Sequence, residues 1–410
     1  MISYETALEK VVQSARVLKP ENLPLLDCCQ KVSAAPVFSR ENLPPFDRSP
    51  LDGYALQAGD TKGASEENPG RLKVVDVLHA GSTAEVAVFP GTAVRIMTGA
   101  PIPPGADCVI RQENTREAGP GEILILEELG SGENIIKAGE DVKEGDVILE
   151  AGEIIAPGDI GLLAALGYTG LRVFPSPKVG ILATGSELIE ISEKPAGGQI
   201  RNSNSYMLAA LVREYGGTPA MAGVCHDDLE EISSSIEKLL EENDIVITTG
   251  GVSVGDYDLL PDALERIGAH RLFWKVAMKP GTPLLAAEKN NKLILALSGN
   301  PAACLITFQQ FAGPCLLKMQ GRRDCNHRWG KAVLTENINV RKSSHLRFVR
   351  GHCRQNEEGV PEVKATGSQK PGVLSSFRSY NCYIVVPEKT SPGKGDWVGI
   401  QYNQTSMAYR

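Results

Sequence analysis

Residues 244–258, DIVITTGGVSVGDYD, decide the fold of this chain. The stretch opens with a short apolar run that is typical of a buried strand and then reaches two adjacent glycines, Gly250 and Gly251. Asp256 and Asp258 follow within a few residues, and the stretch holds no histidine, cysteine or lysine. Because glycine permits close approach of the backbone to a ligand, we predict a strand end that exposes N–H groups and offers carboxylates.

Strand and helix patterns alternate on both sides of this stretch. Apolar runs predict strands at 178–183, 219–224, 244–249 and 292–297. Helical patterns follow three of them: one helix begins at Asn202 or Ser203, and the others span 228–242 and 301–319. This alternation implies right-handed crossovers and a doubly wound, mainly parallel α/β sheet covered by helices on both faces.

Three strand ends of the predicted sheet carry polar, glycine-bearing loops. Ligands of open α/β sheets bind beyond the carboxyl ends of the strands, so we expect the loops to converge on one site, although each could be a simple strand-to-helix turn. In the last loop, an asparagine and a proline favour a helix start whose free N–H groups bind an anion. The candidate ligand-binding residues are Thr184, Gly185, Ser186, Gly250, Gly251, Ser253, Ser298, Gly299, Asn300 and Pro301.

Carboxylates on the same loops predict a bound cation. Glu187, Asp256 and Asp258 would repel an anionic ligand unless a metal bridges them, and Mg²⁺ takes one or two carboxylates together with phosphate oxygens. The alternative is that these acids only cap helices. In residues 272–283, LFWKVAMKPGTP, strand alternation puts Lys275 and Lys279 on one face, about 13 Å apart. They could hold the two ends of a long anion, or be solvated lysines on a sheet edge.

The segments outside the α/β region are mainly β-rich. A first helix capped by Ser3 places apolar residues at helical spacing as far as Leu18 and ends before Pro20. Residues 54–135 and the residues after about 323 read as short strands separated by turns. The chain therefore combines a central α/β domain with smaller β domains.

Composition excludes several classes of protein. With 410 residues and a net charge of −8, the chain is long enough for several domains and has little nonspecific affinity for nucleic acid or an anionic membrane. Its nine cysteines form no C-x-x-C pair, which fits reduced thiols in a cytoplasm. The first residues lack the basic and apolar regions of a signal peptide, and no apolar run reaches the roughly 20 residues of a membrane helix. We expect a cytoplasmic protein with no nucleic-acid or membrane partner.

Seven motifs in order resemble one family over essentially the whole chain. They are PPFDRSPLDGYA (44–55), RIMTGAPIPPGAD (95–107), AGEDVKEGD (138–146), GILATGSELIE (180–190), TTGGVSVGDYD (248–258), FWKVAMKPGTP (273–283) and SGNPAA (298–303). Together they resemble the bacterial MoeA family of molybdopterin molybdenumtransferases, which is related to the gephyrin E domain. Each motif is moderately specific, and the ordered set is highly specific.

The resemblance implies four domains and a homodimer. The expected parts are a discontinuous N-terminal hinge domain (1–52 with 136–175), an inserted β domain (53–135), the α/β molybdopterin-binding domain (176–322) and a C-terminal β-barrel domain (323–410).

The resemblance also implies a reaction and assigns residues to it. The reaction is insertion of molybdate into adenylylated molybdopterin, with Mg²⁺-dependent release of AMP. The implied functional acids are Asp52, Asp141, Glu187, Asp256 and Asp258, of which the last three would bind the metal. Anions would be held by Lys275, Lys279 and Arg350, and the cleft would be lined further by Thr98, Ser368 and Ser375. Either Asp227 or Asp228 matches another acid of the family.

Two departures from the family pattern and two other functions stay open. Leu51 replaces the usual methionine and conserves its volume, whereas Ser298 replaces a proline and puts substrate affinity in doubt.

The protein could instead be a catalytically silent molybdopterin carrier or scaffold, or a tungsten-selective paralogue. Expected partners, besides the pterin and the oxyanion, are transient ones: the molybdopterin adenylyltransferase and apo-molybdoenzymes or their chaperones.

Overall fold

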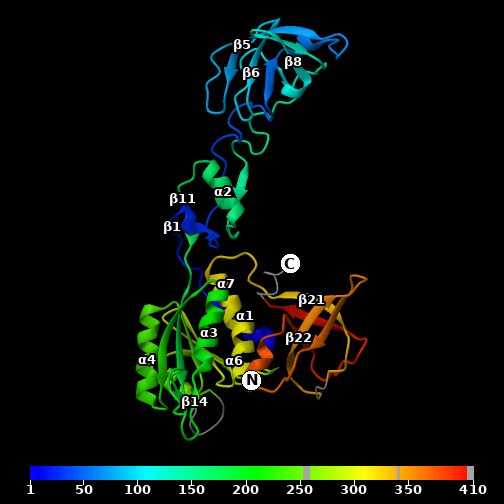
Figure 1. The fold of residues 1–410 in the computed structure, drawn as a ribbon. Coiled ribbons are helices and arrows are strands. Elements are labelled where there is room, and N and C mark those ends of the chain that lie inside the picture. Colours follow the sequence, from blue (N-terminus) through cyan, green and yellow to red (C-terminus); the bar gives the residue numbers. More distant parts are fainter. Residues whose placement is uncertain (253–258, 339–341, 404–410) are drawn as a thin grey trace.

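The computed structural model describes residues 1–252, 259–338 and 342–403, and it is elongated (Figure 1). The α/β domain and the C-terminal β-barrel lie side by side at one end, and a small hinge region connects them to a β domain at the other end. This outer domain corresponds to the insertion predicted for residues 53–135, and the chain enters and leaves it once. The division into four domains with those boundaries stays a prediction.

The central sheet has the strand order β15-β12-β16-β20-β19-β17. The first four strands pair in parallel, and β19 and β17 add an antiparallel edge, so the predicted mainly parallel sheet is confirmed. The strand bounds are Thr218–Cys225 (β15), Lys178–Thr184 (β12), Ile245–Thr249 (β16), Lys292–Leu297 (β20), Leu285–Lys289 (β19) and His270–Trp274 (β17).

Helices cover both faces of this sheet (Figure 1). In β16, Ile245 and Ile247 pack into one hydrophobic core and Val246 into the other, which explains why the strand is apolar without alternation. One face carries α1 (Tyr4–Ser14), α3 (Ser203–Glu214), α6 (Pro301–Thr307) and α7 (Gly313–Met319). The opposite face carries α4 (Leu229–Glu242) and α5 (Leu260–Arg266).

The helix ends agree with the sequence only in part. Ser3 caps α1 and Asn202 caps α3, each by accepting a backbone N–H. However, α1 stops at Ser14 instead of continuing to Leu18, whose N–H donates to the carbonyl of Met319. The helix predicted over 301–319 is interrupted by a π-helical turn, Phe308–Ala312, between α6 and α7.

The hinge region and the outer domain are built from short strands. The hinge contains α2 (Pro157–Ala165), β1 (Glu21–Pro24), β2 (Val32–Ser33), β11 (Gly170–Phe174), β3 (Val37–Phe38) and β10 (Val147–Leu149). The outer sheet has the order β7-β4-β6-β5-β9-β8. Its strands are β4 (Gly53–Leu56), β5 (Gly70–Leu78), β6 (Thr92–Ile96), β7 (Cys108–Arg111), β8 (Thr115–Gly119) and β9 (Glu122–Ile125).

The C-terminal strands close into a barrel. β22 pairs with both β23 and β24, so the order β22-β23-β21-β25-β24 returns to β22 and the predicted β-barrel is confirmed. The bounds are Arg328–Leu334 (β21), Leu346–Gln355 (β22), Pro361–Ala365 (β23), Cys382–Val386 (β24) and Trp397–Tyr402 (β25).

The single strand predicted for the two lysines is wrong. β17 ends at Trp274, and Lys275 has a φ of 72°, which breaks the extended backbone. The next strand, β18 (Met278–Lys279), pairs with β22 of the barrel instead of the central sheet. This segment therefore crosses from one domain to the next, because its two ends hydrogen-bond to different sheets.

Buried polar contacts join the barrel to the α/β domain. The Tyr4 hydroxyl donates to Gln310 Oε1 at 2.7 Å, and Gln310 Nε2 donates to Gln401 Oε1 at 2.6 Å. One helix side chain therefore bonds both the N-terminal helix and a barrel strand. No helix among the described residues is long and apolar enough to cross a membrane.

Candidate ligand-binding site

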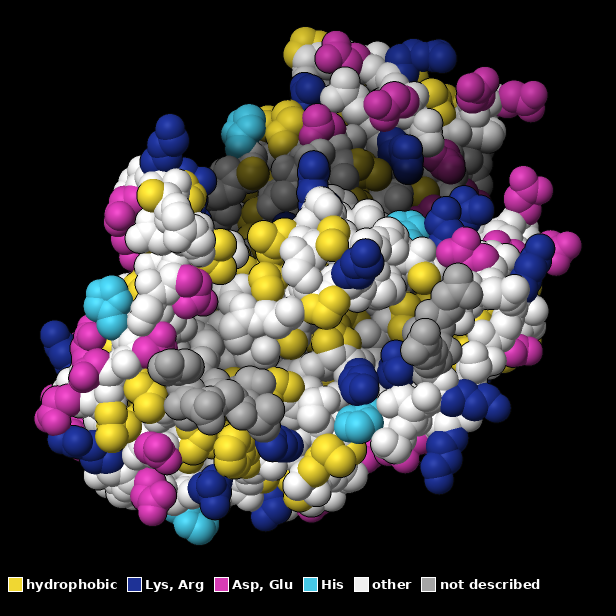
Figure 2. All heavy atoms as spheres, turned by 90° about the horizontal axis from the view of Figure 1, so that it is seen from below, with side chains coloured by type: hydrophobic (Ala, Val, Ile, Leu, Met, Phe, Trp, Pro, Cys, Tyr) yellow, Lys and Arg dark blue, Asp and Glu magenta, His cyan; other side chains and the backbone are white. Residues whose placement is uncertain are grey.

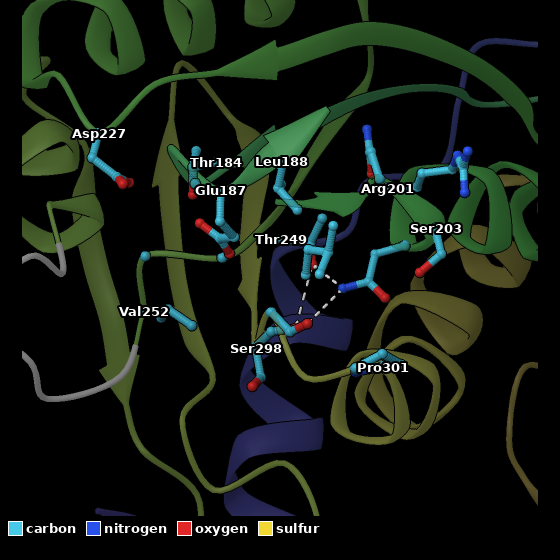
Figure 3. Close-up of a pocket in the computed structure, with 17 residues that line it drawn as sticks. Thr184, Glu187, Leu188, Arg201, Ser203, Asp227, Thr249, Val252, Ser298 and Pro301 are labelled. Atoms are coloured by element: carbon cyan, nitrogen blue, oxygen red, sulfur yellow. Dashed lines mark hydrogen bonds between the residues drawn. The ribbon is translucent and has the colours of Figure 1, made fainter. Parts of the chain in front are cut away.

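A cavity of about 300 Å³ opens at the carboxyl ends of the parallel strands (Figure 3). The three loops predicted to converge do meet there, after β12, β16 and β20. Of the predicted residues, those lining it are Thr184, Gly185, Glu187, Gly250, Gly251, Ser298, Gly299 and Pro301. The remaining lining residues are Leu188, Ile200, Arg201, Asn202, Ser203, Asn204, Asp227, Thr249 and Val252.

The glycines of these loops allow one loop to approach another. Gly250 has a φ of 105°, and a Cβ added to it would lie 2.1 Å from the carbonyl oxygen of Thr184. A Cβ on Gly251, at a φ of 58°, would lie 2.8 Å from Leu260 Cδ2. Packing therefore requires glycine at both positions, against the end of β12 at Gly250 and against the start of α5 at Gly251, in addition to any contact with a ligand.

Two carboxylates face the cavity from the loops after β12 and β15. Glu187 folds back over Gly185, where an added Cβ would meet its Oε2 at 2.7 Å. Asp227 Oδ2 accepts hydrogen bonds from the N–H of Ser186 at 3.0 Å and from its hydroxyl at 2.9 Å. Asp228 instead caps α4 by accepting the N–H of Glu231 at 2.9 Å. The structure thus assigns the two neighbouring acids different positions, which the sequence had left open.

The oxygen donors at the cavity suit a hard cation. Thr184 Oγ1 is buried and has no hydrogen-bond partner, and the Glu187 carboxylate lies at the same loop. Carboxylate and hydroxyl oxygens are ligands that Mg²⁺ accepts. Across residues 1–252, 259–338 and 342–403, no three His, Cys, Asp or Glu side chains are grouped closely enough to hold a metal by themselves. Ser253, Asp256 and Asp258 lie outside the described residues.

The third loop departs from the sequence prediction at one residue. Asn300 occupies the N-cap position of α6, but its side chain accepts no capping hydrogen bond and its Oδ1 is buried without a partner. The side chain does not line the cavity, whereas its neighbours Gly299 and Pro301 do. The loop is held instead by contacts to the adjacent strand end.

The two lysines lie apart from the lining residues. The Lys275 ammonium is 4.8 Å from the ring centroid of Trp274, a cation–π contact. The indole Nε1 of Trp274 donates to the carbonyl of Val252 at 3.3 Å, and Val252 lines the cavity. Lys275 is therefore linked to the cavity edge through one aromatic ring, whereas Lys279 is exposed on β18.

The barrel residues predicted for the site, Arg350, Ser368 and Ser375, do not line the cavity. Arg350 is 1% exposed, its Nη2 donates to the carbonyl of Ser368 at 2.8 Å, and burial lowers the pKa of its guanidinium. No carboxylate of the described chain forms an ion pair with it. The carbonyl of Pro371 accepts the N–H of Ala302, next to Pro301. This bond brings the segment that carries Ser368 and Ser375 against the start of α6. Both serines are exposed.

Asp52, Thr98 and Asp141 are not brought to this cavity within one chain. Asp52 Oδ1 accepts the N–H of Thr98 at 2.7 Å and its hydroxyl at 2.8 Å, and these two bonds lower the pKa of Asp52. Asp141 is exposed in the hinge, where its N–H donates to the carbonyl of Leu43. Figure 1 shows the outer domain at the end of the molecule opposite β14 (Ile200–Arg201), which lines the cavity.

Sequence reasoning missed the part of the cavity contributed by α3 and β14. Arg201 and Asn204 carry no motif, and Asn202 and Ser203 were recognised only as possible helix caps. The available signal was position: a helix that follows a ligand-binding loop presents its first turn to the same strand ends.

Comparison with known proteins agrees with this architecture. Residues 2–167 match the MoeA N-terminal region (domains I and II), residues 180–318 a probable molybdopterin binding domain, and residues 331–401 the MoeA C-terminal region (domain IV). A molybdopterin molybdenumtransferase of Bacillus subtilis (strain 168) is 38% identical over 392 residues, which cover 95% of this chain and 91% of the relative. One of Staphylococcus aureus (strain Mu50) is 36% identical, with 94% and 91% covered. The crystal structure of a MoeA molybdopterin biosynthesis protein from Pyrococcus horikoshii has a TM-score of 0.84 and 31% identity, with 98% of this chain and 99% of that one covered.

The fold and the cavity define a class of protein: a parallel α/β ligand-binding domain that carries a hinged outer β domain and a closed C-terminal β-barrel. Within this class, the chain belongs to the MoeA family. It therefore has a role in molybdenum cofactor biosynthesis.

Proposed function

We propose that the protein inserts molybdate into adenylylated molybdopterin and releases AMP. The observation that carries this proposal is the cavity itself, where three polar loops meet at the carboxyl ends of parallel strands. Its lining offers backbone N–H groups, hydroxyls and two carboxylates, which can orient a pterin with its phosphates. The relatives that match almost the whole chain are named molybdopterin molybdenumtransferases.

The charges on the face of the molecule seen from below, together with a buried arginine, support an anionic substrate. Figure 2 shows hydrophobic and basic side chains in the middle of the face seen from below, whereas most acidic side chains lie near its outline. The buried Arg350 guanidinium has no carboxylate partner among the described residues, so a bound oxyanion would compensate its charge. We assign anion binding to Arg350, Lys275 and Lys279, and further lining of the cleft to Ser368 and Ser375.

A magnesium ion is part of this proposal. Glu187 and the hydroxyl of Thr184 would hold it, together with Asp256 and Asp258, while substrate phosphate oxygens complete its coordination. Bound Mg²⁺ would neutralise charge that develops when the pyrophosphate is cleaved. Asp227 holds the loop of Ser186 in place, which positions the neighbouring Glu187 carboxylate.

We further propose that the active protein is a homodimer with composite sites. Asp52, Thr98 and Asp141 do not line the cavity of their own chain, so a second copy would have to supply them. The hinge region presents apolar side chains that a partner chain could cover: Leu26 is 77% exposed and Val147 50%. In a two-fold dimer, each site would combine these residues of one chain with the α/β cavity of the other.

The proposed activity is tested by measuring AMP release from purified protein with adenylylated molybdopterin, Mg²⁺ and molybdate or tungstate. Molybdate-dependent AMP release supports the proposal. Pterin binding without AMP release in the presence of either oxyanion would identify a carrier or scaffold, and tungstate-selective release would identify a tungsten-specific enzyme. Titrating both oxyanions in parallel separates these outcomes.

The composite site is tested with two inactive variants, Asp52→Ala and Glu187→Ala. A heterodimer of the two has one site with both lesions and one with neither. Random assortment makes about half of the dimers hetero, so activity should return to roughly a quarter of wild type. The chains are co-expressed or refolded together. Purified heterodimers that stay inactive, while wild-type dimers treated identically recover, would show that each site is built within a single chain.

The place of this reaction implies transient protein partners. Adenylylated molybdopterin must come from a molybdopterin adenylyltransferase, and the product must pass to apo-molybdoenzymes or their chaperones. We propose contacts with both and a cytoplasmic location. Crosslinking of purified pairs, with and without pterin, tests them.

A further inference from the structure

Asn204, in the first turn of α3, connects two of the three cavity loops. Its Nδ2 donates to Thr249 Oγ1 at 3.0 Å and to the carbonyl of Gly299 at 2.8 Å. These acceptors lie at the end of β16 and in the loop after β20 (dashed lines in Figure 3). A single amide group thus bonds the two loops from a third element.

The orientation of this amide is determined by its partners. Both acceptors face Nδ2, and the Gly299 carbonyl can only accept a hydrogen bond. A flipped amide would place Oδ1 against that carbonyl and lose the bond to it, and the Thr249 hydroxyl could donate to Oδ1 only by giving up its bond to the carbonyl of Ser298. Oδ1 is buried and has no partner in the present orientation, so the site tolerates an unsatisfied oxygen in order to keep the two N–H bonds.

The bond to Thr249 leads to a further hydrogen bond between the same two loops. The Thr249 hydroxyl accepts from Asn204 and donates to the carbonyl of Ser298 at 3.3 Å. The Ser298 hydroxyl in turn accepts the N–H of Asn300 at 3.3 Å. Around these bonds, the loop backbones are in contact, because a Cβ added to Gly299 would lie 3.4 Å from the Cα of Gly250.

We propose that Asn204 is a positioning residue that sets the spacing of the loops after β16 and β20, and with it the width of the cavity. For the ligand, this inference rests on the proposed function. Asn204 acts through Thr249 and Gly299, which bring their backbone groups to the cavity wall. Without its two hydrogen bonds, the loop of residues 298–301 is held to the end of β16 by the longer Thr249–Ser298 bond and by backbone contacts. The loop then samples wider positions, and the pterin loses affinity.

The chain offers a matched control at the other end of the same helix. Gln320 Nε2 also donates to two carbonyls, those of Tyr215 at 2.7 Å and Leu316 at 2.8 Å, and Tyr215 is the C-cap of α3. Asn204→Leu and Gln320→Met are both near-isosteric and uncharged, and each removes one double donor. Neither adds a charge that would itself repel an anionic ligand.

Two measurements on the full-length protein test the proposal. Hydrogen exchange of residues 298–303 should accelerate at least about tenfold in Asn204→Leu and stay at the wild-type rate in Gln320→Met. Affinity for adenylylated molybdopterin should fall at least about tenfold in the first variant only. Should wild type bind no pterin, the proposed function is wrong, and the exchange rates alone decide the role of Asn204.

A milder variant keeps the test decisive if Asn204→Leu does not fold. Thr249→Val removes the other end of the connection and should change the exchange of residues 298–303 and the affinity in the same direction. In the double variant the two effects should be less than additive, because both remove one connected set of bonds. Wild-type exchange and affinity in folded Asn204→Leu or in Thr249→Val, or full additivity, would overturn the proposal.

Discussion

Gly250→Ala tests whether contact between strand ends shapes the cavity. At a φ of 105°, Gly250 lies outside the regions that L-residues favour, and an alanine there costs about 1–3 kcal/mol in backbone strain. The added Cβ would also lie 2.1 Å from the carbonyl oxygen of Thr184. The substitution therefore combines strain with a steric clash at the cavity wall.

The clash gives the size of the expected displacement. A carbon–oxygen contact needs about 3.3 Å, so the backbone at Thr184 must move by roughly 1 Å. Misplacing a catalytic group by that distance lowers the rate about 100-fold. We expect Gly250→Ala to lower the free energy of unfolding by about 2–4 kcal/mol and AMP release by about two orders of magnitude.

Gly268→Ala is the control, because Gly268 has a φ of 71° and an added Cβ there would meet nothing within 4 Å. It should lose about 1–2 kcal/mol of stability and keep its activity. The assays are urea unfolding and AMP release at saturating molybdate. Wild-type activity in Gly250→Ala, or equal loss of activity in both variants, would refute the reasoning about the cavity wall.

Three further predictions concern charge. Burial lowers the pKa of His327 to about 4, against a value near 6.5 in the unfolded chain. The free energy of unfolding should therefore fall by at most about 3 kcal/mol as the pH drops from about 6.5 to 4, because the unfolded chain takes up the proton first. His327→Gln should flatten that part of the pH profile, measured by urea unfolding. Lys279→Ala should raise the molybdate requirement or weaken pterin binding, with a loss that shrinks at high salt; a drop in melting temperature with unchanged binding would make the lysine structural. Asp256→Asn should lower AMP release about 100- to 1000-fold and leave pterin binding nearly intact, and near-normal turnover at saturating Mg²⁺ would contradict its assignment.

Local patterns determined the parallel strands of the α/β domain. The apolar run before Thr249 forms a strand that is buried on both faces. An uninterrupted apolar run predicts such a strand without knowledge of the strands that flank it. The same reasoning located the three loops at one edge of the sheet, since parallel strands end on the same side. The seven motifs identified the family because they occur together and in one order along the chain.

Tertiary structure alone decided how side chains within those elements are used. Lys275 and Lys279 alternate as a strand would, yet the backbone turns at Lys275 so that the next residues can pair with the barrel. Asp227 and Asp228 are equivalent in sequence, and only the position of Ser186 separates a cavity acid from a helix cap.

Asn204 shows the physical reason most directly. Its partners lie 45 and 95 residues away along the chain. No local pattern specifies such bonds, because a hydrogen bond depends on distance and angle, and packing of α3 against the sheet sets both. The sequence by itself therefore determined the parallel strands, the loops at their ends and the family, whereas contacts between distant residues decided which side chains shape the cavity.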